Sequence, residues 1–321
     1  MAQNSIHHVT AIAGDARRNR DFYTRVLGLR MVKRTVNFDD PGTYHFYYGD
    51  EAGHPGSLLT FFPWAHVAPR RLGIGETQET RFRVPEGALG FWAHRFVAEN
   101  VAHDAVEKRF GESVLPFRDP DGTRLALVAV PGVEAEPAWS TEDVPAGNAI
   151  RGLHGVGLLL GETAATAAIL TDVFGFRETG REDNVTRFET GGLGGVIDLR
   201  AAPGFLRGRP GGGTVHHIAF RARDDAEQAD LVEKLVTRHG VHTTEQKDRD
   251  YFRSVYFREP GGVIFEIATD EPGFTIDEPA SELGQSLKLP KGLEPHRKEI
   301  EAVLPELDPV SGEPPDAEPV S

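Results

Sequence analysis

The sequence contains no cysteine among its 321 residues. This absence excludes disulfide bonds, thiolate metal sites and cysteine nucleophiles. A transition metal bound by this chain would therefore need histidine, aspartate or glutamate as ligands. Histidine is the residue type to follow, because the chain has 13 copies of it.

The chain also lacks a long hydrophobic run and an excess of positive charge. Its longest apolar run, residues 125–130, is far shorter than the roughly 20 residues of a membrane-spanning helix. Residues 1–5 do not resemble the start of a signal peptide. The net charge is −14, which argues against nucleic acid or an anionic membrane as a partner. We expect a soluble, cytoplasmic protein that binds neither.

The chain repeats one plan four times: a short strand, an amphipathic helix, then two or three strands separated by glycine-rich turns. The four modules begin near residues 6, 79, 153 and 215. In the first, Asp15 is the expected helix N-cap and Gly28 ends the helix. A period of about 60 residues is too long for a solenoid and indicates βαβββ modules of an α+β fold. Each module alone leaves an open sheet edge and half a core, so we expect the modules to pair.

Composition changes along the chain divide it into domains. We predict that modules one and two form a domain over residues 5–133, and modules three and four a similar domain over residues 150–270. A stretch rich in proline, glycine, alanine and glutamate at 134–149 is the predicted linker. Spaced apolar residues predict a packing extension over 271–304, and an acidic, proline-containing end predicts a disordered tail over 305–321.

Histidine doublets occupy matching strands of modules one and four. Alignment of the modules places His8 against His217, and Glu266 stands on the last strand of module four. In this alignment the other histidine positions hold Gln78 and Gly155, and the other glutamate positions hold Thr60, Ala126 and Leu199. His154 and Asp198 are each displaced by one residue, which would turn them to the other face of their strands. One complete set of ligands remains.

Two imidazoles and one carboxylate can bind a metal and leave three coordination positions open on one side. Non-heme Fe(II) oxygenases use such positions for substrate and O₂, and Mn(II) fits the same ligands. Zn(II) with two histidines and a glutamate would instead suggest hydrolysis. The pattern predicts a metal site at His8, His217 and Glu266 without selecting the reaction.

Several motifs resemble the vicinal oxygen chelate superfamily, and more narrowly its hydroquinone-cleaving ring dioxygenases. They are IHHVT at 6–10, VKRTVNFDDP at 32–41, GTVHHIA at 213–219, REPGG at 258–262 and FTIDEP at 274–279. The resemblance covers residues 5 to about 307. It implies two similar domains with half-barrel mixed sheets and a mononuclear Fe(II) held by the set named above. It also implies that O₂ opens the ring of a small aromatic diol with para hydroxyls.

The resemblance further implies catalytic roles for residues around the metal. Tyr256 would hydrogen-bond the substrate oxygen, and the Arg249 cation would stabilise negative charge on substrate or product. Thr10 shares a strand face with His8, which predicts a place in the pocket. His7 and His216 match acid–base residues of the family, although simple alternation points them away from the neighbouring ligands. The resemblance implies no organic cofactor.

Three alternatives remain open from the sequence. A catechol-type extradiol dioxygenase would prefer catechols. A glyoxalase-like isomerase would use Zn(II) or Ni(II) with glutathione and consume no O₂. A metal-free binding protein would not need the three ligands.

Histidines in the modules without a ligand set are expected to be structural or exposed: His45, His54, His66 and His94. A homo-oligomer is compatible with the sequence.

Overall fold

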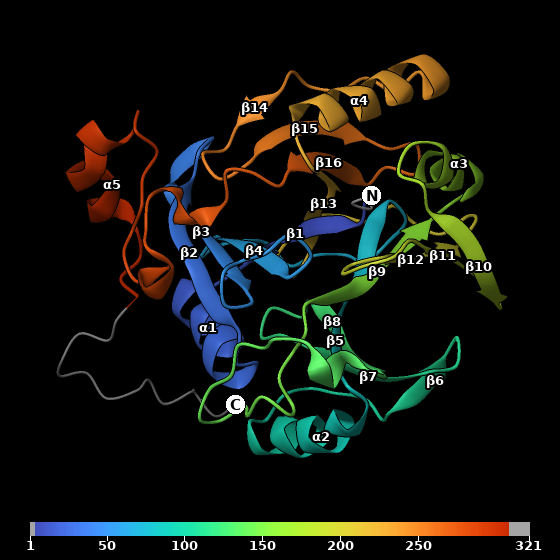
Figure 1. The fold of residues 1–321 in the computed structure, drawn as a ribbon, viewed down its shortest axis with the longest axis horizontal. Helices are drawn as coiled ribbons and strands as arrows, with labels where there is room; N and C mark the ends of the chain where they lie inside the picture. Colours follow the sequence, from blue (N-terminus) through green and yellow to red (C-terminus); the bar gives the residue numbers. More distant parts are fainter. Residues whose placement is uncertain (1–3, 308–321) are drawn as a thin grey trace.

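The computed structural model describes residues 4–307 and contains two curled, eight-stranded mixed sheets (Figure 1). Sheet one has the strand order β14-β15-β16-β13-β1-β4-β3-β2, and sheet two has the order β10-β11-β12-β9-β5-β8-β7-β6. At the centre of each sheet, the first strand of one module pairs antiparallel with the first strand of another. These pairs are β1 with β13 and β5 with β9. The predicted α+β fold with half-barrel mixed sheets is confirmed.

The strands of sheet one come from the two ends of the chain: β1 (Ile6–Ala13), β2 (Arg30–Asn37), β3 (Asp40–Gly49), β4 (Leu58–Pro63), β13 (Val215–Ala222), β14 (Lys247–Asp248), β15 (Arg253–Arg258) and β16 (Ile264–Thr269). The strands of sheet two come from its middle: β5 (Glu76–Pro85), β6 (Glu107–Arg109), β7 (Glu112–Arg118), β8 (Arg124–Val130), β9 (Leu153–Leu160), β10 (Arg177–Glu182), β11 (Val185–Glu189) and β12 (Val196–Ala201).

The modules therefore pair differently from the prediction. Module one shares sheet one with module four, and module two shares sheet two with module three. The prediction that modules one and two pair with each other, and modules three and four with each other, is therefore wrong, whereas the bounds of 5–133 and 150–270 stay a prediction. All four modules present the same kind of open edge, so hydrophobic periodicity does not identify the partner of each edge.

Helices cover the outer faces of the sheets: α1 (Ala16–Asp21, continued by a π-helical turn, Phe22–Val26), α2 (Leu89–Ala98), α3 (Ala164–Asp172), α4 (Asp225–His239) and α5 (Arg297–Val303). Short 3₁₀ turns occupy Glu86–Ala88, Val133–Ala135, Phe274–Ile276, Ala280–Glu282 and Glu294–His296. The expected caps are present. The carboxylate of Asp15 accepts a hydrogen bond from the backbone N–H of Arg18, and Gly28 ends the turn with φ of 67°.

The residues after β16 pack on the outside of sheet one, beside β2 and β3 (Figure 1). Phe274, Leu283 and Leu289 are buried there, as expected for a packing extension. Leu307 is also buried and its carbonyl accepts a hydrogen bond from Arg20, so the predicted disorder is wrong for residues 305–307. The rest of the predicted tail, 308–321, lies outside the described residues.

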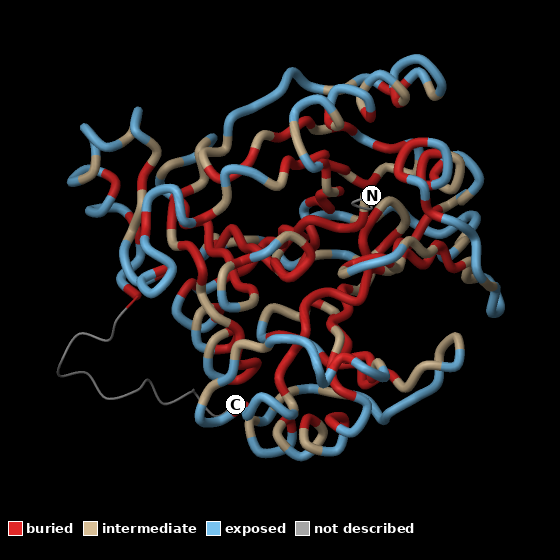
Figure 2. Tube along the Cα trace, in the orientation of Figure 1, coloured by how far each residue is buried: buried red, intermediate tan, exposed pale blue. Residues whose placement is uncertain are grey.

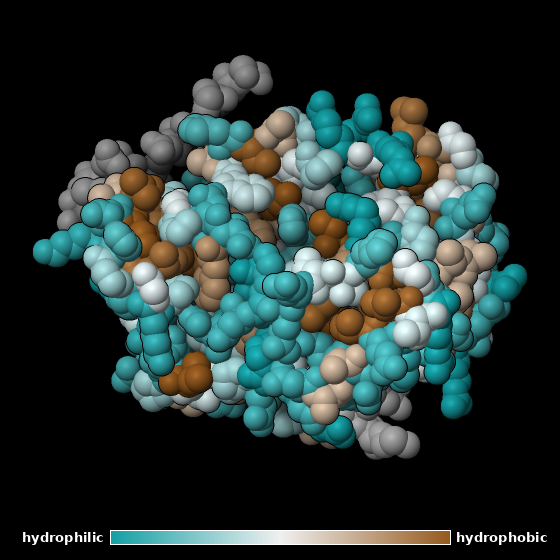
Figure 3. Space-filling model, turned by 90° about the horizontal axis from the view of Figure 1, so that it is seen from above, coloured by the Kyte–Doolittle hydropathy of each residue, from teal (hydrophilic) through white to brown (hydrophobic). Residues whose placement is uncertain are grey.

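Buried residues follow both sheets through the interior, and the exposed segments lie around the rim (Figure 2). On the face seen from above, hydrophobic side chains form separate patches among hydrophilic ones (Figure 3). Within residues 4–307, no helix has the length and apolar character needed to cross a membrane.

Candidate metal centre

Two β-bulges bring the histidine doublets together at the centre of sheet one. In the pairing of β1 with β13, Thr10 lies opposite His217 and His8 lies opposite Ala219. The register shifts once before His8 and once after Thr10. His7 on β1 and His216 on β13 are therefore extra residues without a partner on the opposite strand. A bulge redirects side chains and breaks the simple alternation of a strand. The doublets therefore do not follow the alternation assumed from the sequence.

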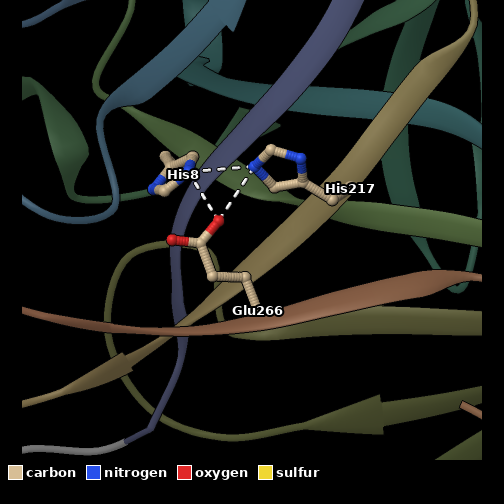
Figure 4. A group of neighbouring side chains, drawn as sticks. All are labelled: His8, His217 and Glu266. Atoms are coloured by element: carbon tan, nitrogen blue, oxygen red, sulfur yellow. Dashed lines mark hydrogen bonds and ion pairs between the residues drawn. The ribbon is translucent and has the colours of Figure 1, made fainter. Parts of the chain in front are cut away.

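The three predicted metal ligands converge on one point (Figure 4). The Nε2 atoms of His8 and His217 lie 3.4 Å apart, and Oε2 of Glu266 lies 3.4 Å from the first and 2.9 Å from the second. Two donor atoms bound at right angles to one ion, each at about 2.1 Å, are separated by about 3.0 Å. The triangle thus has the size of one face of an octahedron.

The environment of Glu266 also fits a bound cation. Its Oε2 atom is fully buried and has no hydrogen-bond partner of acceptable geometry, although His217 is close. Burial by itself would raise the pKa of this carboxyl, but His8 and His217 hold the pKa well below its usual range. Burial also lowers the pKa of His217 despite the nearby carboxylate. A neutral imidazole and an ionised carboxylate are the forms in which these residues ligate a metal.

Neighbouring side chains contact the outer atoms of the three ligands. Nδ1 of His7 lies 3.0 Å from Nδ1 of His8, and Nδ1 of His216 lies 2.8 Å from Nδ1 of His217. The expectation that alternation points these residues away is wrong, because both occupy bulges. The hydroxyl of Ser254 donates to the second oxygen of Glu266. Such outer contacts orient ligands toward a metal.

A cavity of about 380 Å³ opens beside the two histidine ligands. Tyr256 and Arg249 both line it, and Arg249 Nε donates to the Tyr256 hydroxyl over 3.3 Å. Tyr256 stands directly opposite Glu266 in the pairing of β15 with β16. Arg249 also donates to Asp39 over 2.9 Å, and this contact lowers the pKa of the Asp39 carboxyl. Besides Tyr256, the wall contains the aromatic residues Phe38, Tyr47, Phe62, Trp64 and Phe252.

Thr10 is placed differently from the prediction. It is completely buried and does not line the cavity. Its hydroxyl lies 2.8 Å from that of Thr60, which lies 3.0 Å from Nε2 of His45. Thr10 therefore reaches the cavity wall only through a chain of hydrogen bonds.

His45 is a site residue that the sequence analysis missed. It was expected to be structural or exposed, but it lines the cavity and its Nδ1 lies 2.9 Å from the hydroxyl of Tyr47. Burial, with His8 and His217 nearby, lowers the pKa of His45 well below its usual value. The period-two alternation of β3, which puts His45 and Tyr47 on one face, was the available signal. As expected, His54, His66 and His94 are exposed.

Sheet two carries ion pairs where sheet one carries the ligands. Its register places Glu79, Gly155 and Asp198 at the positions of His8, His217 and Glu266. The predicted alignment, with Gln78 at the position of His8 and Leu199 at the position of Glu266, is therefore wrong by one residue. Asp198, predicted to be displaced from the glutamate position, occupies it. Sheet two also has a pair of bulges, at Gln78 and His154, in the positions that His7 and His216 occupy in sheet one.

The Asp198 carboxylate is held by two buried guanidinium groups. Arg81 and Arg187 both donate to it, and Arg187 also donates to Glu112. Within residues 4–307, His8, His217 and Glu266 form the one group of three histidine, aspartate or glutamate side chains whose donor atoms are close enough to hold a metal.

Comparison with known proteins agrees with this architecture. The model of the Glyoxalase/Bleomycin resistance protein/Dioxygenase superfamily matches residues 5–127 and 152–267. A Bacillus subtilis protein named provisionally as the ring-cleaving dioxygenase MhqO is 46% identical, with 93% of this chain and 95% of the relative aligned. A chlorohydroquinone/hydroquinone 1,2-dioxygenase of Sphingobium indicum is 32% identical, with 92% and 94% aligned.

Two solved structures extend the comparison. A Bacillus subtilis protein described provisionally as a dioxygenase superimposes with a TM-score of 0.90 at 44% identity, covering 96% of this chain and 99% of the other. Glyoxalase I from Zea mays gives a TM-score of 0.63 at 14% identity, with 83% and 92% covered. At that identity the second similarity concerns the fold alone.

Proposed function

This chain belongs to the glyoxalase/bleomycin resistance protein/dioxygenase superfamily, and within it to the ring-cleaving dioxygenases; from this premise we propose that it opens the ring of a hydroquinone with Fe(II) and O₂. One observation carries the proposal. The donor atoms of His8, His217 and Glu266 converge beside a cavity with aromatic walls. The 32% identical relative, named as a hydroquinone dioxygenase, supports the substrate class.

The donor set favours Fe(II). Two imidazoles and one carboxylate leave open positions for substrate and O₂, and a bound Fe(II) would supply the activation of O₂. Mn(II) fits the same donors, so the metal content of the purified protein decides between them. The net reaction breaks the bond between a hydroxylated ring carbon and its neighbour. Each of these carbons gains one oxygen atom, so diol and O₂ give one open-chain acid that also carries an aldehyde.

Tyr256 and Arg249 would orient and stabilise the substrate. A para-diol cannot chelate one ion through both hydroxyls, so side chains must fix its orientation. Burial and the charge of Glu266 raise the pKa of Tyr256, which keeps its hydroxyl protonated and able to donate to the substrate oxygen. The Arg249 guanidinium beside it would stabilise negative charge that develops on the ring oxygen.

His7 and His216 would act mainly through the ligands that they contact. His216 borders the cavity, which also supports the acid–base role implied by the family resemblance. His7 does not line the cavity, so its proposed role is to hold the ring of His8. Thr10, remote from the cavity, would support Thr60 and His45.

Metal analysis combined with O₂ uptake tests the proposal. Protein is loaded with Fe(II) without air, and a hydroquinone is then added. It should consume O₂ once air is admitted, and His8→Ala should abolish this uptake. The exposed His54 provides a matched control, and His54→Ala should retain activity. Faster turnover of catechols would indicate a catechol-type enzyme. Glutathione-dependent isomerisation without O₂ uptake would indicate a glyoxalase-like enzyme. The cytoplasmic location and a homo-oligomeric state stay predictions.

A further inference from the structure

Sheet one has an internal two-fold relationship that gives Tyr256 a counterpart on the opposite side of the ligands. Tyr256 lies opposite Glu266 in the pairing of β15 with β16. Tyr47 lies opposite Thr60 in the pairing of β3 with β4. Thr60 in turn pairs across from Thr10, just as Glu266 pairs across from Ala219. The two tyrosines therefore occupy equivalent positions, and both line the same cavity.

The hydroxyl of Tyr47 is fixed by His45. The Tyr47 oxygen lies 2.9 Å from Nδ1 of His45, and the two rings are in contact with centres 4.1 Å apart. The other nitrogen of His45 is bonded to Thr60, so the imidazole cannot turn without losing a hydrogen bond. A phenol can donate one hydrogen bond and accept others, so Tyr47 keeps capacity for a ligand after its contact with His45.

Apolar aromatic surface lies between this hydroxyl and the ligands. The ring centre of Phe252 is 5.1 Å from that of His8 and 6.3 Å from that of Tyr47. Phe62 packs against His45 with ring centres 4.3 Å apart. The cavity thus has a polar group near the metal site at Tyr256, a second polar group at Tyr47, and walls suited to a flat ring.

A para-diol carries its hydroxyls at opposite ends of the ring, whereas a catechol carries both at one end. We propose that Tyr47, held in place by His45, hydrogen-bonds the hydroxyl of a para-diol that lies away from the metal site, and so favours hydroquinones over catechols. This inference rests on the proposed function. Tyr47 is a specificity-determining residue in this scheme, and His45 is a positioning residue.

The test compares Tyr47→Phe with Tyr48→Phe. Tyr48 is the neighbouring residue on β3, and its buried hydroxyl donates to Asn19 over 2.9 Å, away from the cavity. Loss of one hydrogen bond to substrate corresponds to a change of about tenfold. Tyr47→Phe should raise KM for hydroquinone about tenfold with little change in kcat and no change in KM for catechol. Tyr48→Phe should leave the ratio of the two substrates unchanged.

A second variant and a binding measurement separate the possible failures. His45→Phe keeps an aromatic ring beside Phe62 but removes both hydrogen bonds, and it should also lower the preference for hydroquinone. Anaerobic titration calorimetry with hydroquinone reports binding without turnover. Hydroquinone binding that is equally tight in Tyr47→Phe and wild type would overturn this inference. Wild-type protein that binds hydroquinone but consumes no O₂ with any diol would contradict the proposed function alone.

Discussion

Nδ1 of His7 lies 3.0 Å from Nδ1 of His8, and the same contact joins His216 to His217 at 2.8 Å. Each ligand thus has one ring nitrogen engaged by its neighbour in sequence, while the other nitrogen faces the shared centre. The arrangement depends on two bulges, because adjacent residues of a regular strand point to opposite faces.

Replacement of His7 by phenylalanine should weaken metal binding. The variant keeps a ring of similar shape but removes the contact that orients His8, and loss of such an outer contact costs about 10–100-fold in affinity. Competition between the protein and a chelator for Mn(II) measures the change. His154→Phe is the control, because His154 occupies a bulge of sheet two, at the position of His216, and contacts Glu112 instead of a ligand. Unchanged affinity in His7→Phe would contradict the positioning role.

Glu266→Gln should abolish stabilisation by metal. An ion present at one hundred times its dissociation constant raises the free energy of unfolding by about 2.7 kcal/mol. Wild-type protein should therefore show a higher melting temperature with Mn(II), and the variant should show no change. Asp198→Asn, at the equivalent position of sheet two, is expected to retain the response to Mn(II). It should nevertheless lower the free energy of unfolding by about 3–5 kcal/mol, because it removes the negative charge that Arg81 and Arg187 share in the interior.

Tyr256→Phe should lower kcat with little effect on KM. Loss of one hydrogen-bond donor that acts on developing charge typically reduces the rate about 10²-fold. O₂ uptake at saturating hydroquinone measures this directly. Tyr23→Phe removes a buried tyrosine hydroxyl that donates to Asp119, outside the cavity, and should retain wild-type kcat. If Tyr256→Phe turned over at the wild-type rate, the hydroxyl could not be the substrate's partner.

The ion pairs of sheet two should make stability depend on pH in the acid range. Burial opposes ionisation of Glu112, but hydrogen bonds from His154 and Arg187 outweigh it and lower the pKa to about 2. Because this pKa is depressed in the folded state, the stabilisation is complete above the ordinary value near 4.5 and is lost as pH falls toward 2.

Glu112→Gln removes this contribution. The difference in the free energy of unfolding between wild type and variant should therefore shrink by about 2 kcal/mol between pH 6 and pH 3. Denaturant titrations at the two pH values measure it. The exposed pair of Glu178 and Arg181 supplies the control, since solvent screens this pair and Glu178→Gln should alter the pH dependence far less than Glu112→Gln. A constant difference at both pH values would contradict the depressed pKa.

Local rules were sufficient for the module plan, and alignment of the four modules was sufficient to select His8, His217 and Glu266. Capping residues such as Asp15 act within one turn, so the sequence contains the whole signal. Bulges are different, because the extra residue is defined only by the partner strand. This is why His7 was expected to point away from the metal site.

The pairing of modules illustrates the same difference. Periodicity defines each strand but not the strand beside it. The histidine doublets nevertheless contained the information, since one metal can be shared by His8 and His217 only if modules one and four meet. His45 was missed because its partners, Tyr47 and Thr60, are polar residues without a charge or motif to mark them.

The union of the first and last modules in one sheet has a consequence for biosynthesis. β1 must remain without its partner β13 until more than two hundred residues have been added to the growing chain. Contacts so distant in sequence slow folding, and an exposed strand edge can join the wrong strand in the meantime. Translation therefore completes sheet two, whose strands lie between residues 76 and 201, before the last strand of sheet one leaves the ribosome.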